Sequence, residues 1–233
     1  MLHKHKNNCL FFKQNVCLIC QLKHSDQSPI CRACQVDLPW LEEQCVRCAL
    51  PLSSANNYCP ACLRKKPDFD QVYCAFKYAF PVNAMIPPGK FSNRTDYLSA
   101  LNQLALKTIS FITYPDCLVP VPMHPKKLLQ REYNHAWLLA QDISRTFNIP
   151  IRNDILYKRI HTRNQINLSA AKRRQNLRNS FQCVNSPPPH IMLVDDVVTT
   201  GTTTNIISKL LKQAGCKRVD VFALTRTDKP SGK

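Results

Sequence analysis

Two adjacent aspartates and a cluster of threonines occupy one stretch of the chain, IMLVDDVVTTGTT, at residues 191–203. Ionised carboxylates only accept hydrogen bonds, so Asp195 and Asp196 suit donors such as ribose hydroxyls, or a metal ion with its waters. The hydroxyl-rich turn that follows would place donors at the start of a helix, which favours an anion. The pattern predicts a cradle for a ribose 5-phosphate, with the sugar hydroxyls on the aspartates and the phosphate in the turn.

The phosphate-binding part of this stretch is predicted to be Thr199, Thr200, Gly201, Thr202 and Thr203. Gly201 permits a positive φ and a close approach of the backbone to a phosphate. The chain has only 4 glycines, so a glycine in this turn is informative. The alternative is structural, with the aspartates ending a strand and the threonines capping a helix. The complete pattern is more specific than an acidic pair alone and favours the phosphate site.

Eight of the 13 cysteines form a repeat in the amino-terminal third of the chain. Four C-x-x-C pairs begin at residues 17, 31, 45 and 59, so their spacing is constant. Two such pairs can surround one tetrahedral zinc ion, and closed four-cysteine sites are normally structural. We therefore expect two structural zinc sites. The simplest pairing places Cys17, Cys20, Cys31 and Cys34 around one ion, and Cys45, Cys48, Cys59 and Cys62 around the other.

A crossed pairing of the cysteines and a redox role are the alternatives for this repeat. A redox pair needs one C-x-x-C, whereas four at constant spacing favour metal. The segment has too few apolar residues for a core of its own, so zinc would supply its folding free energy. The stretch KKPDFDQ at residues 65–71 breaks the pattern. We expect a zinc-binding domain at residues 1–66 and a second domain at residues 67–233.

The second domain must position the phosphate site, and its sequence alternates between strand and helix patterns. Strands are expected at residues 72–80, 117–123, 190–198 and 219–227, and helices at residues 94–111, 134–147 and 203–215. This order predicts an α/β fold with a parallel sheet flanked by helices. Ligands of such sheets bind beyond the carboxyl ends of the strands, which is where the acidic pair and the threonines are expected.

Charge and composition limit the partners of the protein. The chain has 233 residues and a formal net charge of +17. This balance favours polyanionic partners such as nucleic acid or phosphorylated small molecules, the alternative being a soluble basic enzyme. No stretch approaches the roughly 18 to 20 apolar residues of a membrane span, and the first residues lack the apolar core of a signal peptide. We expect a cytoplasmic protein without membrane insertion.

The chain contains three stretches in a characteristic order: VPVPMHPKKLLQREYNHAWLLA at residues 119–140, KRIHTRNQINLSAAKRRQNLRNSF at residues 158–181, and IMLVDDVVTTGTT. Together they resemble the ComF proteins, a competence-associated branch of the type I phosphoribosyltransferases. ComF proteins often have a cysteine zinc ribbon in front. The resemblance implies a phosphoribosyltransferase-like fold that binds phosphoribosyl pyrophosphate (PRPP) with Mg²⁺. It also implies a role in natural transformation, in which the protein handles incoming single-stranded DNA.

The resemblance also assigns residues to PRPP by matching position. Asp195 and Asp196 would meet the ribose hydroxyls, and the five residues from Thr199 to Thr203 would hold the 5-phosphate. The pyrophosphate and Mg²⁺ would face a second loop, formed by Pro122, Met123, His124 and Arg131.

Two departures from the ComF pattern affect these assignments. The relatives usually show Arg-Gly-aromatic-Asn, whereas this chain has Glu132 after Arg131, which adds a negative charge beside an anion loop. The relatives also have a continuous helix before a Lys–aromatic pair. Here the stretch MIPPGKF at residues 85–91 places two prolines and a glycine before Lys90, which predicts a broken helix.

A basic segment separates the predicted pyrophosphate loop from the acidic pair. Residues 155–194 contain no Asp or Glu, and the cations of interest there are Arg159, Arg163, Lys172, Arg173 and Arg174. The segment is expected to close over PRPP or to contact a DNA backbone, and the alternative is a solvated basic helix. Proteins that bind single strands usually add aromatic stacking platforms, and only Tyr157 and Phe181 are near in sequence.

Three functions fit these observations. The first is a protein that uses PRPP, as ligand or substrate, and binds single-stranded DNA during uptake, with a DNA-processing or helicase partner expected from the resemblance. The second is a metabolic phosphoribosyltransferase for a nitrogenous acceptor, and the third is a non-catalytic PRPP sensor. We expect the first, because the sequence identifies neither an acceptor-binding segment nor a catalytic nucleophile.

Overall fold

The computed structural model describes residues 15–53, 57–92, 94–159 and 179–228. The chain divides into two compact units, Met1–Leu38 and Pro39–Lys233. The sequence-based boundary lies instead after residue 66. The difference arises because the second group of cysteines is buried in the same apolar cluster as the parallel sheet, and so belongs to the larger unit.

The smaller unit consists of short elements around the first group of cysteines. Strands β1 (Asn15–Val16) and β2 (Lys23–His24) pair antiparallel, and helix α1 (Arg32–Val36) follows. Among the described residues of this unit, only Cys17, Ile30 and Leu38 are buried. So few buried side chains make a metal the expected source of stability for this unit.

The larger unit is built on a four-stranded parallel sheet. Its strands are β3 (Gln71–Lys77), β4 (Cys117–Pro120), β7 (His190–Val198) and β8 (Arg218–Arg226), in the order β3-β8-β7-β4. Every neighbouring pair is parallel, so the four predicted strands and the α/β class are confirmed. The four residues Ile191 to Val194 are fully buried because helices or loops cover both faces of the sheet.

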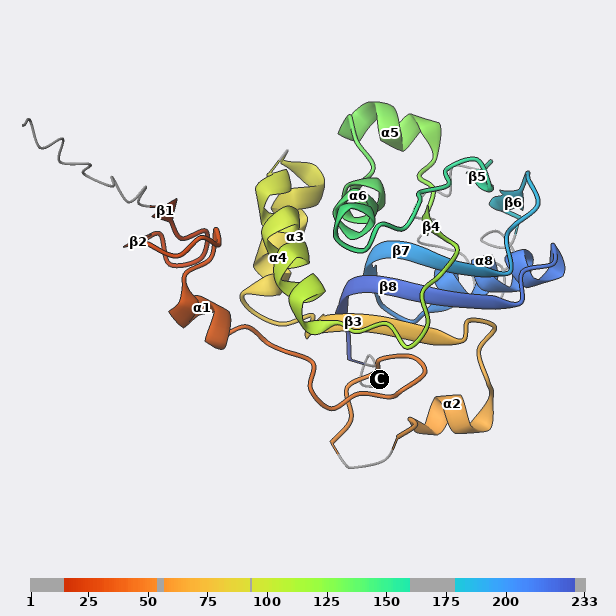
Figure 1. Ribbon diagram of the computed structural model, residues 1–233, viewed down its shortest axis with the longest axis horizontal. Coiled ribbons are helices and arrows are strands. Elements are labelled where there is room, and N and C mark those ends of the chain that lie inside the picture. Colours follow the sequence, from red (N-terminus) through yellow and green to blue (C-terminus); the bar gives the residue numbers. More distant parts are fainter. Residues whose placement is uncertain (1–14, 54–56, 93, 160–178, 229–233) are drawn as a thin grey trace, which may run out of the picture. The chain divides into compact units, whose positions relative to one another are not determined.

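Helices cover one face of the sheet. They are α3 (Val82–Phe91), α4 (Thr95–Thr108) and α6 (His135–Phe147), of which the last two confirm the predicted helices. Figure 1 shows α4 and α6 on one side of the sheet and the segment that contains α2 (Pro60–Arg64) on the other. The acidic pair therefore lies in a central strand that is held between two layers.

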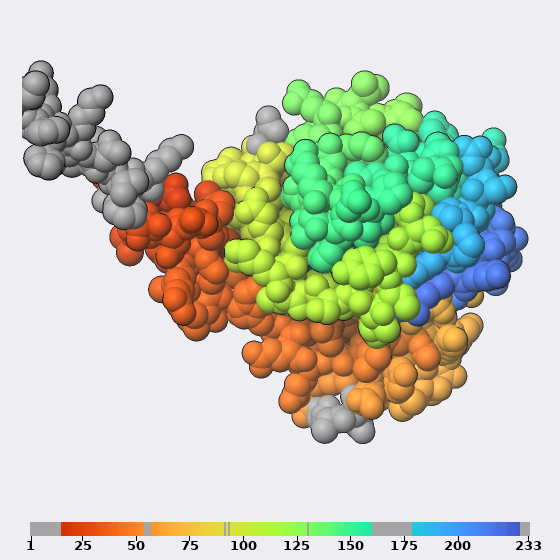
Figure 2. Space-filling model, viewed as in Figure 1, coloured from red at the N-terminus to blue at the C-terminus, as the bar shows by residue number. Residues whose placement is uncertain are grey.

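The opposite face is covered by α8 (Thr202–Gln213) together with the second group of cysteines. Alternate side chains of β7 and β8, such as Leu193 and Val221, pack in one cluster with Ile207 of α8 and with Cys48. In Figure 2 residues 39–53 and 57–66, in orange, form part of the surface of the larger unit. The second group of cysteines therefore lies beside α8, in the layer that covers this face of the sheet.

Helix α3 corrects the prediction of a break before Lys90. The helix runs through Pro87 and Pro88, and the Ser92 N–H still donates to the Pro88 carbonyl at 2.9 Å. Proline fixes a helical φ, so its cost is a lost N–H donor and crowding of the preceding turn, which packing can outweigh. A Cβ on Gly89 would lie 2.6 Å from Cγ of Leu98, so the glycine lets α3 and α4 approach closely.

The remaining described elements lie outside the four-stranded sheet. They are α5 (Pro125–Arg131), β5 (Leu156–Lys158) and β6 (Phe181–Cys183), and β5 pairs antiparallel with β6. Among the helices of the described ranges, none has the length and apolar character that crossing a membrane requires.

Candidate functional site

Residues 199–203, called the threonine loop below, comprise the turn after β7 and the first two residues of α8. Gly201 adopts a left-handed conformation with φ of 71° and directly precedes the helix. The hydroxyls of Thr200 and Thr202 lie 2.7 Å apart, and the Thr204 hydroxyl donates to the Gly201 carbonyl at 3.0 Å. The first N–H groups of a helix have no acceptor within it. The predicted threonines therefore meet at a helix N-terminus, where they offer hydroxyl and N–H donors to an anion.

The acidic pair lies near the carboxyl end of β7, and only Val197 and Val198 separate it from the threonine loop. Asp196 is buried, with 4% of its surface exposed, whereas Asp195 is half-buried. The Asp196 N–H donates to Oδ1 of Asp195 at 2.9 Å. Burial and then repulsion by Asp196 raise the pKa of Asp195 to about 7. Donors from a bound ligand would favour the charged form of Asp195.

Three basic side chains surround Asp196 on the α3 and α6 side of the sheet. Nζ of Lys90 lies 2.7 Å from Oδ2 of Asp196, and Nε2 of His135 lies 4.0 Å from the same oxygen. Nη1 of Arg131 lies 3.2 Å from Nε2 of His135. Burial, together with the charges of Lys90 and Arg131, lowers the pKa of His135 to about 4, although the charge of Asp196 opposes the shift. The imidazole is therefore neutral near pH 7 and accepts from the guanidinium.

Lys90 and His135 are site residues that the sequence analysis did not assign. Lys90 was noted only as part of a Lys–aromatic pair behind a predicted helix break. Because α3 is continuous, it delivers Lys90 to Asp196 from more than a hundred positions away in the sequence. The pairing depends on the packing of α3 over the sheet, which no local pattern reveals.

The predicted pyrophosphate loop follows β4 and lies at the same edge of the sheet as the acidic pair, because β4 pairs parallel with β7. Pro122 and Met123 follow one residue after the end of the strand. Nδ1 of His124 accepts from the Lys126 N–H at 3.2 Å and caps α5. The structure thus brings Arg131 to the surroundings of Asp196, while His124 is engaged at the start of its own helix.

Glu132 occupies the position where ComF relatives usually have glycine. Its φ is 64°, in the left-handed region that side chains disfavour. A glycine, which the resemblance implies for this position, would adopt this conformation without a steric cost. The Glu132 side chain is exposed. The neighbouring Tyr133 hydroxyl donates to the Gly89 carbonyl at 2.6 Å, which ties this turn to α3 and hence to Lys90.

The basic segment is described only at its ends. The Arg159 N–H donates to the Ser180 carbonyl at 2.8 Å, and the Arg159 side chain is exposed. Burial, together with the charge of Lys127, lowers the pKa of Lys158, and Asp195 opposes the shift. The other four predicted cations, Arg163, Lys172, Arg173 and Arg174, lie outside the described residues.

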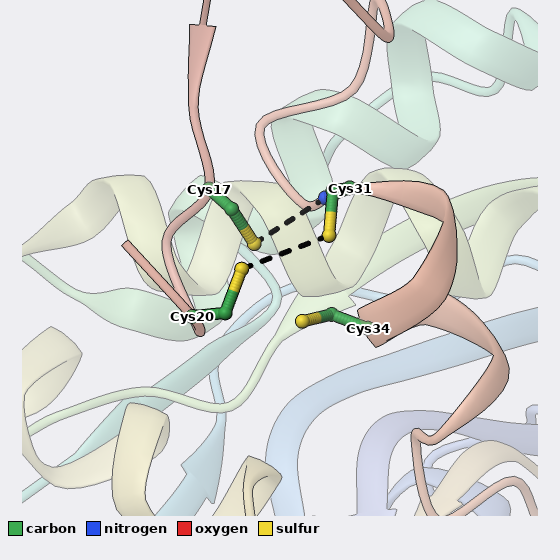
Figure 3. A group of neighbouring side chains, drawn as sticks. All are labelled: Cys17, Cys20, Cys31 and Cys34. Carbon is green, nitrogen blue, oxygen red and sulfur yellow. Dashed lines mark hydrogen bonds between the residues drawn. The ribbon is translucent and has the colours of Figure 1, made fainter. Parts of the chain in front are cut away.

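Two groups of four cysteines match the simplest pairing of the repeat. The first cysteine centre is Cys17, Cys20, Cys31 and Cys34, and the second is Cys45, Cys48, Cys59 and Cys62. In Figure 3 the four sulfurs of the first centre point toward one another. Within each group the sulfurs lie within 4.8 Å of one another. A tetrahedral ion with Zn–S bonds of about 2.3 Å needs sulfurs about 3.8 Å apart, so both centres fit zinc.

In each centre, backbone N–H groups stabilise the thiolate form of one cysteine. Burial would raise the pKa of Cys17, but the N–H groups of Cys31, Cys20 and Ile19 outweigh it and lower the value to about 6. In the second centre, burial acts on Cys45 in the same way, and N–H groups led by that of Cys59 lower its pKa to about 7. Since the thiolate is the form that binds metal, both turns favour an ion.

A cavity of about 800 Å³ lies between the second cysteine centre and α8. Thr199 to Thr202 of the threonine loop line one part of it, and three lysines also contribute, namely Lys65, Lys66 and Lys209. Asp68 in the same lining accepts from Nδ2 of Asn205 at 2.9 Å. The lysines outnumber this carboxylate, so the protein surface of the cavity favours an anionic ligand.

Comparison with known proteins gives consistent names. The chain is 35% identical to "Competence protein F" of Haemophilus influenzae over 213 residues, which covers 87% of this chain and 93% of the relative. It is 32% identical to "DNA utilization protein YhgH" of Escherichia coli over 205 residues, covering 85% and 90% of the two chains. "Competence protein ComFC" of Streptococcus pneumoniae is 51% identical over 39 residues, or 17% of this chain and 18% of that one.

Two other comparisons add little. No model of a known protein family matches the chain. A solved purine phosphoribosyltransferase from Pyrococcus horikoshii covers 70% of this chain and 94% of its own, with 11% identity and a TM-score of 0.29, which supports no argument. The first two relatives, in contrast, match along nearly their whole length. The chain therefore belongs to the ComF family, which includes Competence protein F and the DNA utilization protein YhgH.

Proposed function

We propose that the protein binds PRPP with Mg²⁺ at the threonine loop and the acidic pair, and that it handles incoming single-stranded DNA in the cytoplasm during DNA uptake. One observation carries the proposal: two aspartates near the carboxyl end of the central strand β7 are followed, after Val197 and Val198, by a helix N-terminus with threonine hydroxyls around it. This arrangement offers acceptors for a sugar and donors for a phosphate within one short stretch.

Each charged or polar group of PRPP would have a counterpart in the site. The 5-phosphate would accept from the threonine loop, and the ribose hydroxyls would donate to Asp195 and Asp196. Arg131 lies beside His135, close to Asp196, and would face the pyrophosphate. Mg²⁺ would neutralise part of the pyrophosphate charge, with the carboxylates as its oxygen ligands or as acceptors for its waters.

Lys90 would act both on Asp196 and on the ligand. In the structure its ammonium neutralises the buried Asp196. A ribose hydroxyl that donates to Asp196 would share this carboxylate with Lys90, and the ammonium would then be near the anionic ligand as well. The lysine would therefore favour ligands that bring both a hydroxyl and negative charge.

Support for DNA handling comes from charge and from the relatives. The names of the two long matches are a competence protein and a DNA utilization protein. The formal net charge is +17, and Lys65, Lys66 and Lys209 line the cavity beside the threonine loop. A phosphate backbone is the polyanion that such lysines attract. A DNA-processing or helicase partner is part of the same proposal and would act on the bound strand.

A transferase activity is a second candidate, and Asp195 favours it. Its pKa of about 7 lies near the operating pH, where a carboxylate is most effective as a general base. Such a reaction would move ribose 5-phosphate onto an acceptor and release pyrophosphate. A non-catalytic sensor would instead bind PRPP without releasing pyrophosphate under any acceptor, and product analysis distinguishes the two.

DNA handling is tested with a labelled oligodeoxynucleotide in moderate salt, with and without Mg²⁺ and PRPP, using fluorescence anisotropy on the zinc-loaded full chain. We expect binding that weakens when Lys65, Lys66 and Lys209 are replaced by Glu. The matched control replaces Lys107 by Glu at the end of α4. Absence of binding, together with normal transformation in a deletion strain, would contradict DNA handling.

A further inference from the structure

Arg226 joins three parts of the larger unit at the end of β8. Only 5% of its surface is exposed. Its Nε donates to the Cys48 carbonyl at 3.0 Å, and its Nη1 donates to the Val198 carbonyl at 2.9 Å and to the Thr199 carbonyl. These acceptors belong to the second cysteine centre, to the end of β7 and to the first residue of the threonine loop.

From this arrangement we propose that Arg226 couples the second cysteine centre to the threonine loop, so that metal in this centre strengthens phosphate binding by the loop. The inference rests on the proposed function, because PRPP is the ligand whose binding is measured. It assigns to Arg226 a positioning role, since the side chain acts on the loop backbone and not on the ligand directly.

The first step of the coupling is the orientation of peptide groups in the loop. A trans peptide directs its carbonyl and the following N–H in opposite directions. Because the carbonyls of Val198 and Thr199 face Arg226, the N–H groups of Thr199 and Thr200 point away from it. One planar guanidinium therefore fixes the direction of two donors that are available to an anion.

The second step is electrostatic. The Arg226 side chain donates to four backbone carbonyls, the fourth being that of Thr227 at 3.0 Å. Within the described ranges no carboxylate forms an ion pair with it. A buried charge is costly unless it is compensated. An anion in the threonine loop would supply the missing negative charge at short range.

The third step is the dependence of the Cys48 carbonyl on metal. An ion bound by Cys45 and Cys48 would hold the turn between them, and the Arg47 carbonyl in that turn accepts from the Val72 N–H of β3 at 2.9 Å. Four neighbouring cysteines without an ion are an unfavourable group, because metal binding supplies folding free energy to such turns. Loss of the ion would free the turn, and Arg226 would lose an acceptor that fixes its orientation.

The first cysteine centre provides an internal control. Cys17, Cys20, Cys31 and Cys34 form an equivalent centre in the smaller unit, whereas each contact traced above lies within the larger unit. Coupling between two binding sites is reciprocal, so PRPP must strengthen metal binding at the second centre by the same factor. It should leave the first centre unaffected.

The experiment follows zinc release from the full chain after addition of a chromogenic chelator, with and without saturating Mg²⁺ and PRPP. The Cys31→Ser variant lacks a ligand of the first centre, so its remaining zinc reports the second centre. We expect PRPP to slow this release by about tenfold, within the usual range of coupling between sites. In the wild-type chain one of two zinc equivalents should respond.

A substitution then tests the role of Arg226. Arg226→Lys keeps the charge but loses the planar fork. In the Cys31→Ser background it should bind PRPP at least about fivefold more weakly, and PRPP at saturation should no longer slow zinc release. The matched control is Arg218→Lys at the other end of β8, where Arg218 pairs with Asp220. This substitution should leave the effect of PRPP on zinc release unchanged.

The outcomes separate the inference from the proposed function. Calorimetry on the same protein samples measures PRPP binding directly. If PRPP binds but zinc release from the second centre is unchanged, the coupling is wrong and the proposed function stands. If PRPP does not bind, both are wrong. Should Arg226→Lys fail to fold, the wild-type and Cys31→Ser measurements still decide the matter, because both compare one protein with and without PRPP.

Discussion

Nζ of Lys90 and Oδ2 of Asp196 lie 2.7 Å apart, and this ion pair connects helix α3 to the central strand of the sheet. The lysine comes from a helix that contains two prolines, and the aspartate is almost fully buried. The pair places a charge beside the site where we propose that PRPP binds. The charge environment of the acidic pair therefore depends on the position of α3.

Replacing Lys90 by Met should destabilise the protein and weaken PRPP binding. The buried Asp196 carboxylate would lose its ion-pair partner, which we expect to cost about 2 kcal/mol because Lys90 is itself partly exposed. Urea unfolding of the zinc-loaded protein measures the change. The control Lys107→Met removes an exposed lysine from α4 and should cost less than about 0.5 kcal/mol. Equal effects of the two substitutions would contradict a special role for Lys90.

The pKa of Asp195 predicts how stability depends on pH. This carboxyl titrates at about 7 in the folded protein, against a usual value of 3.8. Between these values the folded state binds more protons than the unfolded state, so this group makes stability fall as the pH rises. From pH 5.5 to 7 the loss should be about 2 kcal/mol, and Asp195→Asn should abolish that part of the slope.

The control for this pH profile is Asp154→Asn. An ion pair with Arg152 holds the pKa of Asp154 at about 2, below the window, so this variant should keep the wild-type slope. Stability is measured by urea unfolding at each pH with zinc in excess. The assignment fails if the Asp195→Asn profile is parallel to that of the wild-type protein.

Glu132→Gly should stabilise the protein and strengthen binding of the pyrophosphate group. Glycine adopts the left-handed conformation at residue 132 without a steric cost, so we expect a gain of about 0.5 to 1 kcal/mol. The substitution also removes a negative charge next to Arg131. Asn148→Gly is the matched control, because Asn148 has a φ of 54° after α6 and asparagine tolerates this region. Thermal unfolding should show a clearly larger gain at residue 132 than at residue 148.

Gly89→Ala should destabilise the contact between α3 and α4. The added Cβ would lie 2.6 Å from Cγ of the buried Leu98. Overpacking of this kind costs about 1 to 3 kcal/mol, partly offset by the higher helix propensity of alanine. In the double variant with Leu98→Ala the added methyl group should cost less than in the wild-type background. If the two substitutions are additive, the close approach of the helices is not the cause.

The regular elements and the cysteine centres could be predicted from sequence because their signals are local. Apolar runs and helical spacing located the four parallel strands and helices α4, α6 and α8. The constant spacing of the C-x-x-C pairs gave both groups of sulfurs. The acidic pair and the threonines are close in sequence, with only Val197 and Val198 between them. Their proximity at the carboxyl end of β7 could therefore be predicted from the sequence.

The residues that sequence reasoning missed all act across long separations. Arg226 contacts Cys48 from 178 positions away, at the end of a strand that otherwise reads as apolar. Lys90 reaches Asp196 only because packing against α4 sustains a helix that its prolines disfavour. The second cysteine centre was assigned to a separate domain because its own segment is poor in apolar residues. It lies in the larger unit because those few residues pack against the sheet.

The central claim is that the acidic pair and the threonine loop bind PRPP, and isothermal titration of Mg²⁺ and PRPP into the zinc-loaded full chain tests it most directly. We predict saturable binding at one site per chain. Asp195→Asn combined with Asp196→Asn should weaken it at least about tenfold, which corresponds to about 1.4 kcal/mol. Asp154→Asn should leave it unchanged. Wild-type affinity in the double variant, or no binding by the wild-type chain, would contradict the account.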